Sequence, residues 1–270
     1  SADADKLAIN KSEAPLKVHL RRSRDIYNAH RTWPTLPTTP PLILIADALI
    51  QHIDGEWWTI YVMLIRTADG RSAVIAPPSY ARGTESPAGW EQAINTLPQA
   101  THCAIQAIVC DGHRGLLWYA KIYGWYIQRC HFHLLAAIHG RRSWSTRSRH
   151  RLLGERLRQL VSYMLYVPEQ ALCMPAFAEL ECIMDETSSR VLRSVLSGFL
   201  THYRDYRTYL VYPELYLPRT SNTAESLIGM IRSLCYRARG FRTIHALRAW
   251  IEALIKHRRT VRCNGVHQPN

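Results

Sequence analysis

Three acidic residues occupy positions where a carboxylate could take part in chemistry. Asp47 interrupts an apolar run at residues 42–50, Asp111 follows a second apolar run at residues 104–110, and Glu225 lies near the start of a helical pattern. Carboxylates are the ligands that hard ions such as Mg²⁺ and Mn²⁺ prefer. Two such ions about 3.5–4 Å apart can activate the attacking oxygen and stabilise the leaving oxygen of a phosphodiester. The three acids therefore predict a two-metal phosphoryl-transfer site.

Each acid also has a purely structural interpretation. Asp111 precedes Gly112 and could be an ordinary turn aspartate, while Asp47 could lie at a strand end. Asn222 and Glu225 have the spacing of a capping box, in which the glutamate only bonds back to the first amide of its helix. These alternatives stay open at the level of the sequence.

The helical pattern after residue 222 favours a functional Glu225. Its spacing to Gly229 and Arg232 places an acid, a gap and an arginine on one helix face. The opposite side is apolar, formed by Ala224, Leu227, Ile228, Ile231 and Leu234. This arrangement is suited to a metal site beside a phosphate backbone.

A strand–helix–strand unit is expected to position Asp111. The apolar run at 104–110 is followed by a helical pattern that stops at Gly124, then by a strand-like run at 125–127 that leads to Cys130 and His133. Such crossovers make the two strands parallel, so both polar clusters should lie at one sheet edge, where ligands of α/β sheets bind.

Three antiparallel strands precede this unit. Hairpin signals at Asp54-Gly55 and Asp69-Gly70 separate strand-like runs at 42–50, 57–66 and 71–76. Ser86-Pro87 then marks the start of a helix. With the strand at 42–50 in the centre, Asp47 and Asp111 should face each other across adjacent strands. We expect an α/β fold with a mixed five-stranded sheet and flanking helices.

Changes in composition divide the chain into five segments. Residues 1–40 are polar, basic and finally proline-rich, and we interpret them as an arm or linker, or as the end of an upstream module. Residues 41–139 and 219–260 form the two parts of the core, residues 140–218 form an all-helical insertion, and residues 261–270 form a polar tail.

Cys130 and His133 allow two interpretations. With Cys110 and His113 they have a spacing that superficially resembles zinc ligands. Because side chains alternate along a strand, an Asp111 that faces the site leaves Cys110 facing the core. We therefore favour a hydrogen bond between Cys130 and His133 that braces the insertion against the sheet edge, and we expect His131 to face solvent.

The charge balance indicates a nucleic-acid partner. The net charge is +13, and 29 of the 34 basic residues are arginine, which suits bidentate phosphate contacts. A GC-rich genome would also raise the arginine content, and a charge run is often only a solvated face. The candidate contacts to double-stranded DNA are Arg141, Arg142, Arg147, Arg149, Arg219, Asn222, Arg232, Arg237 and Arg239. With no apolar run of membrane-spanning length and no signal-peptide pattern, we expect a cytoplasmic, nucleoid-associated protein without a membrane partner.

Four segments together resemble a known family. The segments LILIADAL (42–49), IVCDGHRG (108–115), QRCHFH (128–133) and TSNTAESLIGMIR (220–232) resemble the DDE transposases of prokaryotic insertion sequences, in the branch related to Mutator-like elements. The resemblance covers about residues 41–256. It implies a ribonuclease H-like fold, with Asp47, Asp111 and Glu225 as the catalytic acids and Cys130 and His133 as the Cys-x-x-His signature.

The implied reaction is hydrolysis of a phosphodiester at a transposon end, followed by attack of the freed 3′-hydroxyl on target DNA. The cofactor would be Mg²⁺, with Mn²⁺ as a substitute, and a homodimer or larger assembly would hold the two ends. Two alternatives remain at this stage. One is a non-catalytic, zinc-containing DNA-binding protein derived from a transposase, and the other is a nuclease of the same fold.

Overall fold

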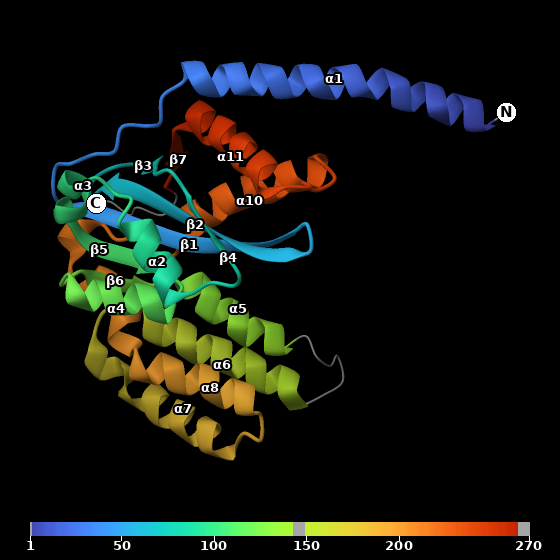
Figure 1. Cartoon of the computed structure of the whole chain (residues 1–270). Helices are drawn as coiled ribbons and strands as arrows, with labels where there is room; N and C mark the ends of the chain where they lie inside the picture. Colours follow the sequence, from blue (N-terminus) through green and yellow to red (C-terminus); the bar gives the residue numbers. More distant parts are fainter. Residues whose placement is uncertain (1, 143–148, 264–270) are drawn as a thin grey trace.

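The computed structural model describes residues 2–142 and 149–263, with side chains placed within residues 16–138 and 153–263. The chain folds as an α/β structure around a mixed seven-stranded sheet (Figure 1). The strand order is β6-β5-β1-β2-β3-β7, and β4 pairs with β2. The strands are β1 (Leu42–Ile53), β2 (Glu56–Thr67), β3 (Ser72–Ile75), β4 (Ser79–Arg82), β5 (Ile105–Cys110), β6 (Tyr126–Arg129) and β7 (Thr260–Arg262).

All five expected strands are present. β1 and β2 form a long antiparallel hairpin whose turn residues, Asp54 and Gly55, both have positive φ. β5 lies parallel to β1 on one side and to β6 on the other. The expected number of five was wrong, because β4 and β7 are too short to produce a periodic pattern. β7 includes the first residues of the segment that we interpreted as a tail.

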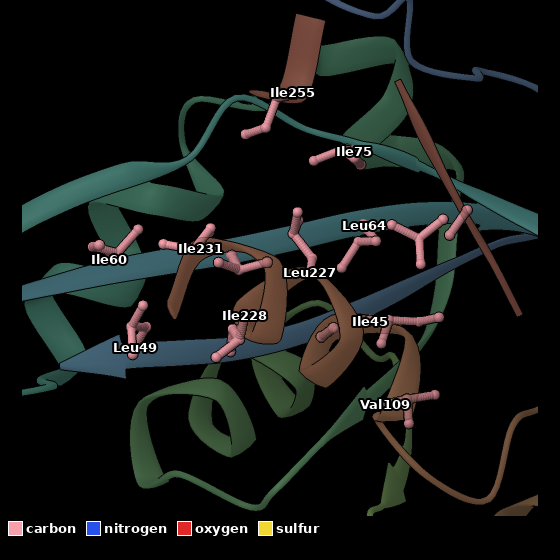
Figure 2. Close-up of a cluster of buried hydrophobic side chains, with 14 of the residues drawn as sticks. Ile45, Leu49, Ile60, Leu64, Ile75, Val109, Leu227, Ile228, Ile231 and Ile255 are labelled. Atoms are coloured by element: carbon pink, nitrogen blue, oxygen red, sulfur yellow. The ribbon is translucent and has the colours of Figure 1, made fainter. Parts of the chain in front are cut away.

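Helices cover both faces of the sheet because its central strands carry apolar side chains on both sides. On one face, α10 (Asn222–Arg237) and α11 (Ile244–Arg258) pack against β1, β2 and β5. Figure 2 shows this core, with residues of α10 lying over Ile45, Leu64 and Val109. The other face packs against α2 (Pro87–Ile94), α3 (Gln99–Ala104) and α4 (Arg114–Ile122).

The segment between β6 and α10 is helical and has its own apolar core, as expected for an insertion. It lies beyond the β6 edge of the sheet, below the sheet in Figure 1. Its α-helices are α5 (His131–Arg142), α6 (Arg149–Tyr166), α7 (Met174–Glu186), α8 (Arg190–Thr201) and α9 (Thr208–Val211), and its short 3-10 turns are η1 (Gln170–Cys173), η2 (Tyr203–Tyr206) and η3 (Pro213–Leu215).

The amino-terminal segment contains a long helix, α1 (Ala2–His30), where the sequence indicated an arm or linker. The carboxyl half of α1 is fixed to α11, because Asn28 donates a hydrogen bond to the Ala249 carbonyl and accepts one from Lys256 Nζ at its own carbonyl. The rest of α1 projects beyond α11 in Figure 1. Within the described residues, no helix combines the length and the apolarity needed to cross a bilayer.

Candidate metal centre

The candidate site lies where β5 and β6 reach their carboxyl ends, beside the middle of the longer strand β1. The parallel register pairs Ile45 of β1 with Val109 of β5, and Asp47 and Asp111 each lie two residues further along. Ile45 and Val109 belong to the core beneath α10, so the alternation of side chains places Asp47 on the α10 face of the sheet. The expected juxtaposition of the two strand positions is therefore present.

Helix α10 places the third acid above this edge. The helix begins at Asn222, with Ser221 as a cap residue that makes no side-chain capping bond. Glu225 is not part of a capping box, and its Oε1 lies 3.1 Å from His133 Nε2 instead. One ligand atom each from Asp47, His133 and Glu225 lies within 4.8 Å of the others. The buried apolar side of α10 is the one that the sequence predicted.

Asp47 is buried without enough partners. It is 8% exposed, and its Oδ1 accepts a hydrogen bond from the Ala48 amide at 2.8 Å. Its Oδ2 is also buried but has no hydrogen-bond partner among the described residues. Burial and the neighbouring Glu225 carboxylate raise the pKa of Asp47 to about 7. A buried carboxylate in this state favours a cationic ligand, because a positive charge would compensate the lost hydration.

Asp111 lies beside this group and not within it. Its Oδ1 accepts a hydrogen bond from the His113 amide at 2.9 Å, as turn aspartates commonly do. It is still close enough to contribute to the raised pKa values of Asp47 and His133. The structure thus brings Asp47 and Glu225 together with His133, whereas the sequence grouped them with Asp111.

Cys130 and His133 join the insertion to the sheet edge. The Cys130 thiol accepts a hydrogen bond from the Ser221 amide at 3.2 Å, which ties the start of α5 to the start of α10. Burial opposes ionisation of this thiol, but hydrogen bonds with His133 and Ser221 outweigh it and lower the pKa of Cys130. The same hydrogen bond with Cys130 raises the pKa of His133 to about 9, against the opposing effect of burial. At neutral pH His133 is therefore a cation close to the Asp47 and Glu225 carboxylates.

The expectation that His131 faces solvent was wrong. It is 1% exposed, and its Nε2 donates a hydrogen bond to the Tyr206 carbonyl at 2.7 Å. Burial lowers the pKa of His131 to about 4. The four residues with zinc-like spacing do not form a metal site either. Cys110 faces the core, as predicted. The group of possible metal ligands among the described side chains, Asp47, His133 and Glu225, contains no cysteine.

Two further residues at this edge were missed by the sequence analysis. The Arg129 guanidinium lies against Gly112, where a side-chain carbon would approach within 2.2 Å of it, and its buried Nε has no partner among the described residues. Glu85 accepts a hydrogen bond from the Trp90 indole at 2.6 Å, and burial raises its pKa. The sequence signals that could have indicated them are their positions, since Arg129 directly precedes Cys130 and Glu85 directly precedes Ser86, the start of α2.

The candidate DNA contacts have different surroundings. Asn222, Arg232, Arg237 and Arg239 are exposed on or just after α10. Arg219 is partly buried, with its guanidinium over the rings of Tyr166 and Tyr209. Arg147 and the side chains of Arg141, Arg142 and Arg149 lie outside the described residues.

Comparison of the chain with protein-family models and with curated proteins finds no match. The geometry of the site is therefore the basis for assigning a function.

Proposed function

We propose that the chain is the catalytic region of a DDE transposase with a ribonuclease H-like fold. Asp47, Asp111 and Glu225 are the acids, DNA is the substrate, and a dimer or larger assembly holds the two transposon ends. The observation that carries this proposal is the buried Oδ2 of Asp47, which has no hydrogen-bond partner among the described residues and lies close to Glu225.

The described residues fit a divalent cation. Asp47 and Glu225 offer carboxylate oxygens close together, and the orphaned Oδ2 of Asp47 gives the site an unmet need for positive charge. Asp47, Glu225 and Asp111 are the residues that would hold Mg²⁺ or Mn²⁺. When bound, such ions supply Lewis-acid activation of a phosphodiester and of its attacking oxygen.

The protein groups around the acids have separate tasks. His133 balances the charge of Asp47 and Glu225 in the metal-free protein and holds Glu225 at 3.1 Å. Arg129, packed on the turn after Asp111, places a fixed cation where a phosphate would lie. Arg232 lies two turns beyond Glu225 on the same helix face, where the flanking DNA backbone would pass.

The test is nicking of supercoiled plasmid in Mn²⁺ at low salt. We expect Asp47→Asn, Asp111→Asn and Glu225→Gln to abolish nicking. Glu252→Gln is the matched control for Glu225→Gln. The exposure of Glu252, on helix α11, is close to that of Glu225, but Glu252 forms a salt bridge with Lys256 and is not part of the carboxylate group. Equal nicking by wild type and all three acid variants would contradict the proposed site.

Metal binding separates the possible causes of a silent nicking assay. Calorimetric titration with Mn²⁺ should show binding to wild type and to Glu252→Gln, and weak or no binding to Asp47→Asn. Stoichiometric zinc in the purified protein, unaffected by Asp47→Asn, would favour the zinc-containing DNA-binding protein. Joining of a supplied 3′-hydroxyl end to plasmid would distinguish a transposase from a nuclease of the same fold.

A further inference from the structure

Tyr236 is an exposed aromatic side chain in the last turn of α10. Its exposure of 87% is the highest among the large apolar and aromatic side chains of the described residues. Four arginines surround it in sequence, and none forms a salt bridge with any residue in the described ranges. They are Arg232, Arg237, Arg239 and Arg242, and all four are exposed. An aromatic ring among unpaired arginines fits an anionic partner that carries flat rings.

Tyr236 shares a helix face with the candidate metal centre. At about 3.6 residues per turn, Glu225, Gly229, Arg232 and Tyr236 fall on one stripe of α10. Gly229 leaves this stripe open, since a side-chain carbon there would meet nothing within 4 Å. Tyr236 lies about 16 Å along the helix from Glu225. At the duplex rise of about 3.4 Å per nucleotide, that distance corresponds to roughly five nucleotides, and to fewer in an extended single strand.

The end of α10 is fixed by backbone hydrogen bonds. The Gly240 amide donates to the Cys235 carbonyl at 2.9 Å, and the Arg239 amide donates to the Tyr236 carbonyl at 3.0 Å. Both Arg239 and Gly240 have positive φ, so the chain turns sharply away from the helix. Tyr236, Arg237, Arg239 and Gly240 line an open pocket at this turn. The ring and the guanidinium groups are therefore presented on a defined backbone.

We propose that Tyr236 stacks on an unpaired DNA base, within about five nucleotides of the phosphate that lies at the carboxylate group. An unpaired base offers its flat face to the ring, whereas a base within a duplex is already stacked on its neighbours. The arginines hold the adjoining phosphates. This inference rests on the proposed function, since it takes DNA to be the molecule that reaches Glu225.

The experiment compares two short DNA probes that differ only in pairing. One is a blunt duplex, and the other has a single-stranded extension carrying 2-aminopurine, whose fluorescence falls on stacking. We expect Tyr236→Ala to weaken binding of the extended probe about tenfold and to abolish the fluorescence change. Tyr236→Phe should behave like wild type, because stacking needs the ring and not the hydroxyl. Tyr163→Ala, which removes another exposed tyrosine, is the matched control.

The outcomes separate this inference from the proposed function. Equal binding of the extended probe by wild type and Tyr236→Ala would overturn the stacking role, even if nicking still depended on Asp47. If Tyr236→Ala weakened binding of the blunt duplex as much as binding of the extended probe, the stacking role would also be overturned. A contact to phosphates alone does not distinguish the two probes. A loss of self-association in Tyr236→Ala, with unchanged DNA binding, would identify a protein interface instead. If the wild type shows no metal-dependent nicking while Tyr236→Ala still abolishes the fluorescence change, that result would support stacking and count against the proposed catalysis.

Discussion

Two buried charges in this protein have opposite surroundings. Arg207, in the helical insertion, is 6% exposed, and its guanidinium donates hydrogen bonds to the carbonyls of Met164 and Pro168 at 2.9 and 2.7 Å. It also lies over the Tyr203 ring. Asp47, in the central strand β1, is 8% exposed, and one of its oxygens has no hydrogen-bond partner among the described residues.

The difference is in how completely hydrogen bonds within the protein replace the hydration of each charge. Burying a charge costs free energy unless hydrogen bonds and opposite charges replace its hydration. The contacts of Arg207 complete that replacement within the protein, so its role is to hold the insertion together. The contacts of Asp47 leave one oxygen without a hydrogen-bond partner among the described residues, and the proposed metal ion would supply the missing positive charge. The following variants test this contrast.

Replacement of Arg207 should cause the largest loss of stability. Arg207→Met removes the guanidinium hydrogen bonds to the carbonyls of Met164 and Pro168 and the contact with the Tyr203 ring, and we expect the free energy of unfolding to fall by about 3 kcal/mol. Urea unfolding measures the change. Arg193→Met, on the exposed side of α8, is the control and should lose less than about 1 kcal/mol. Equal losses in the two variants would mean that Arg207 is not the centre of the insertion.

Replacement of Asp47 should increase the free energy of unfolding when no metal ion is present, opposite to the effect of replacing Arg207. The pKa of Asp47 is 3.8 in an unfolded chain and about 7 in the folded protein. Between these values the folded state binds one more proton at Asp47, so the contribution of Asp47 to the stability of the wild type falls as pH rises from about 4 to 7 and changes no further above that. Asp47→Asn removes this loss.

The shift sets an upper bound of about 4 kcal/mol on the gain. Pairing with His133 and the unmet hydrogen bonds of an amide reduce the expected gain to about 1–2 kcal/mol at pH 8. The gain should disappear near pH 4. Urea unfolding in the presence of a chelator measures both. Added Mn²⁺ should stabilise wild type and not Asp47→Asn, and a variant less stable than wild type at pH 8 would contradict the contrast.

The sheet edge could be predicted from the sequence because strong local patterns encode it. Continuous apolar runs mark β1 and β5 as strands buried on both faces, with Asp47 inside the first run and Asp111 directly after the second. The short crossover through α4 then fixes β5 and β6 as parallel neighbours. The position of Glu225 followed from the apolar stripe of α10.

The inclusion of His133 could not be predicted in the same way. It depends on the direction in which α5 leaves β6, and that direction is set by a hydrogen bond from the Ser221 amide to Cys130 across a large distance in the sequence. The short strands β4 and β7 were missed because pairing with longer strands, and not their own composition, stabilises them. Helix α1 was missed because its polar composition gives little apolar periodicity.

Cys130 has features of both Arg207 and Asp47, because its thiol makes a structural hydrogen bond and also contacts the candidate site through His133. Its replacement should have a smaller effect on stability than replacement of either. Cys130→Ala leaves the buried Ser221 amide without its acceptor, and we expect a loss of about 1 kcal/mol. Because Cys130 also holds His133, Mn²⁺ affinity should fall as well. Cys103→Ala, at an exposed cysteine, should leave both unchanged. A stability loss with unchanged Mn²⁺ binding would place Cys130 with Arg207 as a purely structural residue.

Gly229 should show the smallest effect, and it extends the contrast from charge to backbone. A glycine inside a helix costs about 0.5–1 kcal/mol relative to a good helix former, and no neighbour lies within 4 Å of a side-chain carbon built there. Gly229→Gln should therefore raise the free energy of unfolding by about that amount.

If the stripe from Glu225 to Tyr236 carries DNA, the same variant should weaken DNA binding, because the new side chain fills the gap between Glu225 and Arg232. Gly198→Gln on α8, also an open helix position, should stabilise without affecting DNA. Stabilisation with unchanged DNA binding in both variants would mean that the open stripe is not a path for DNA.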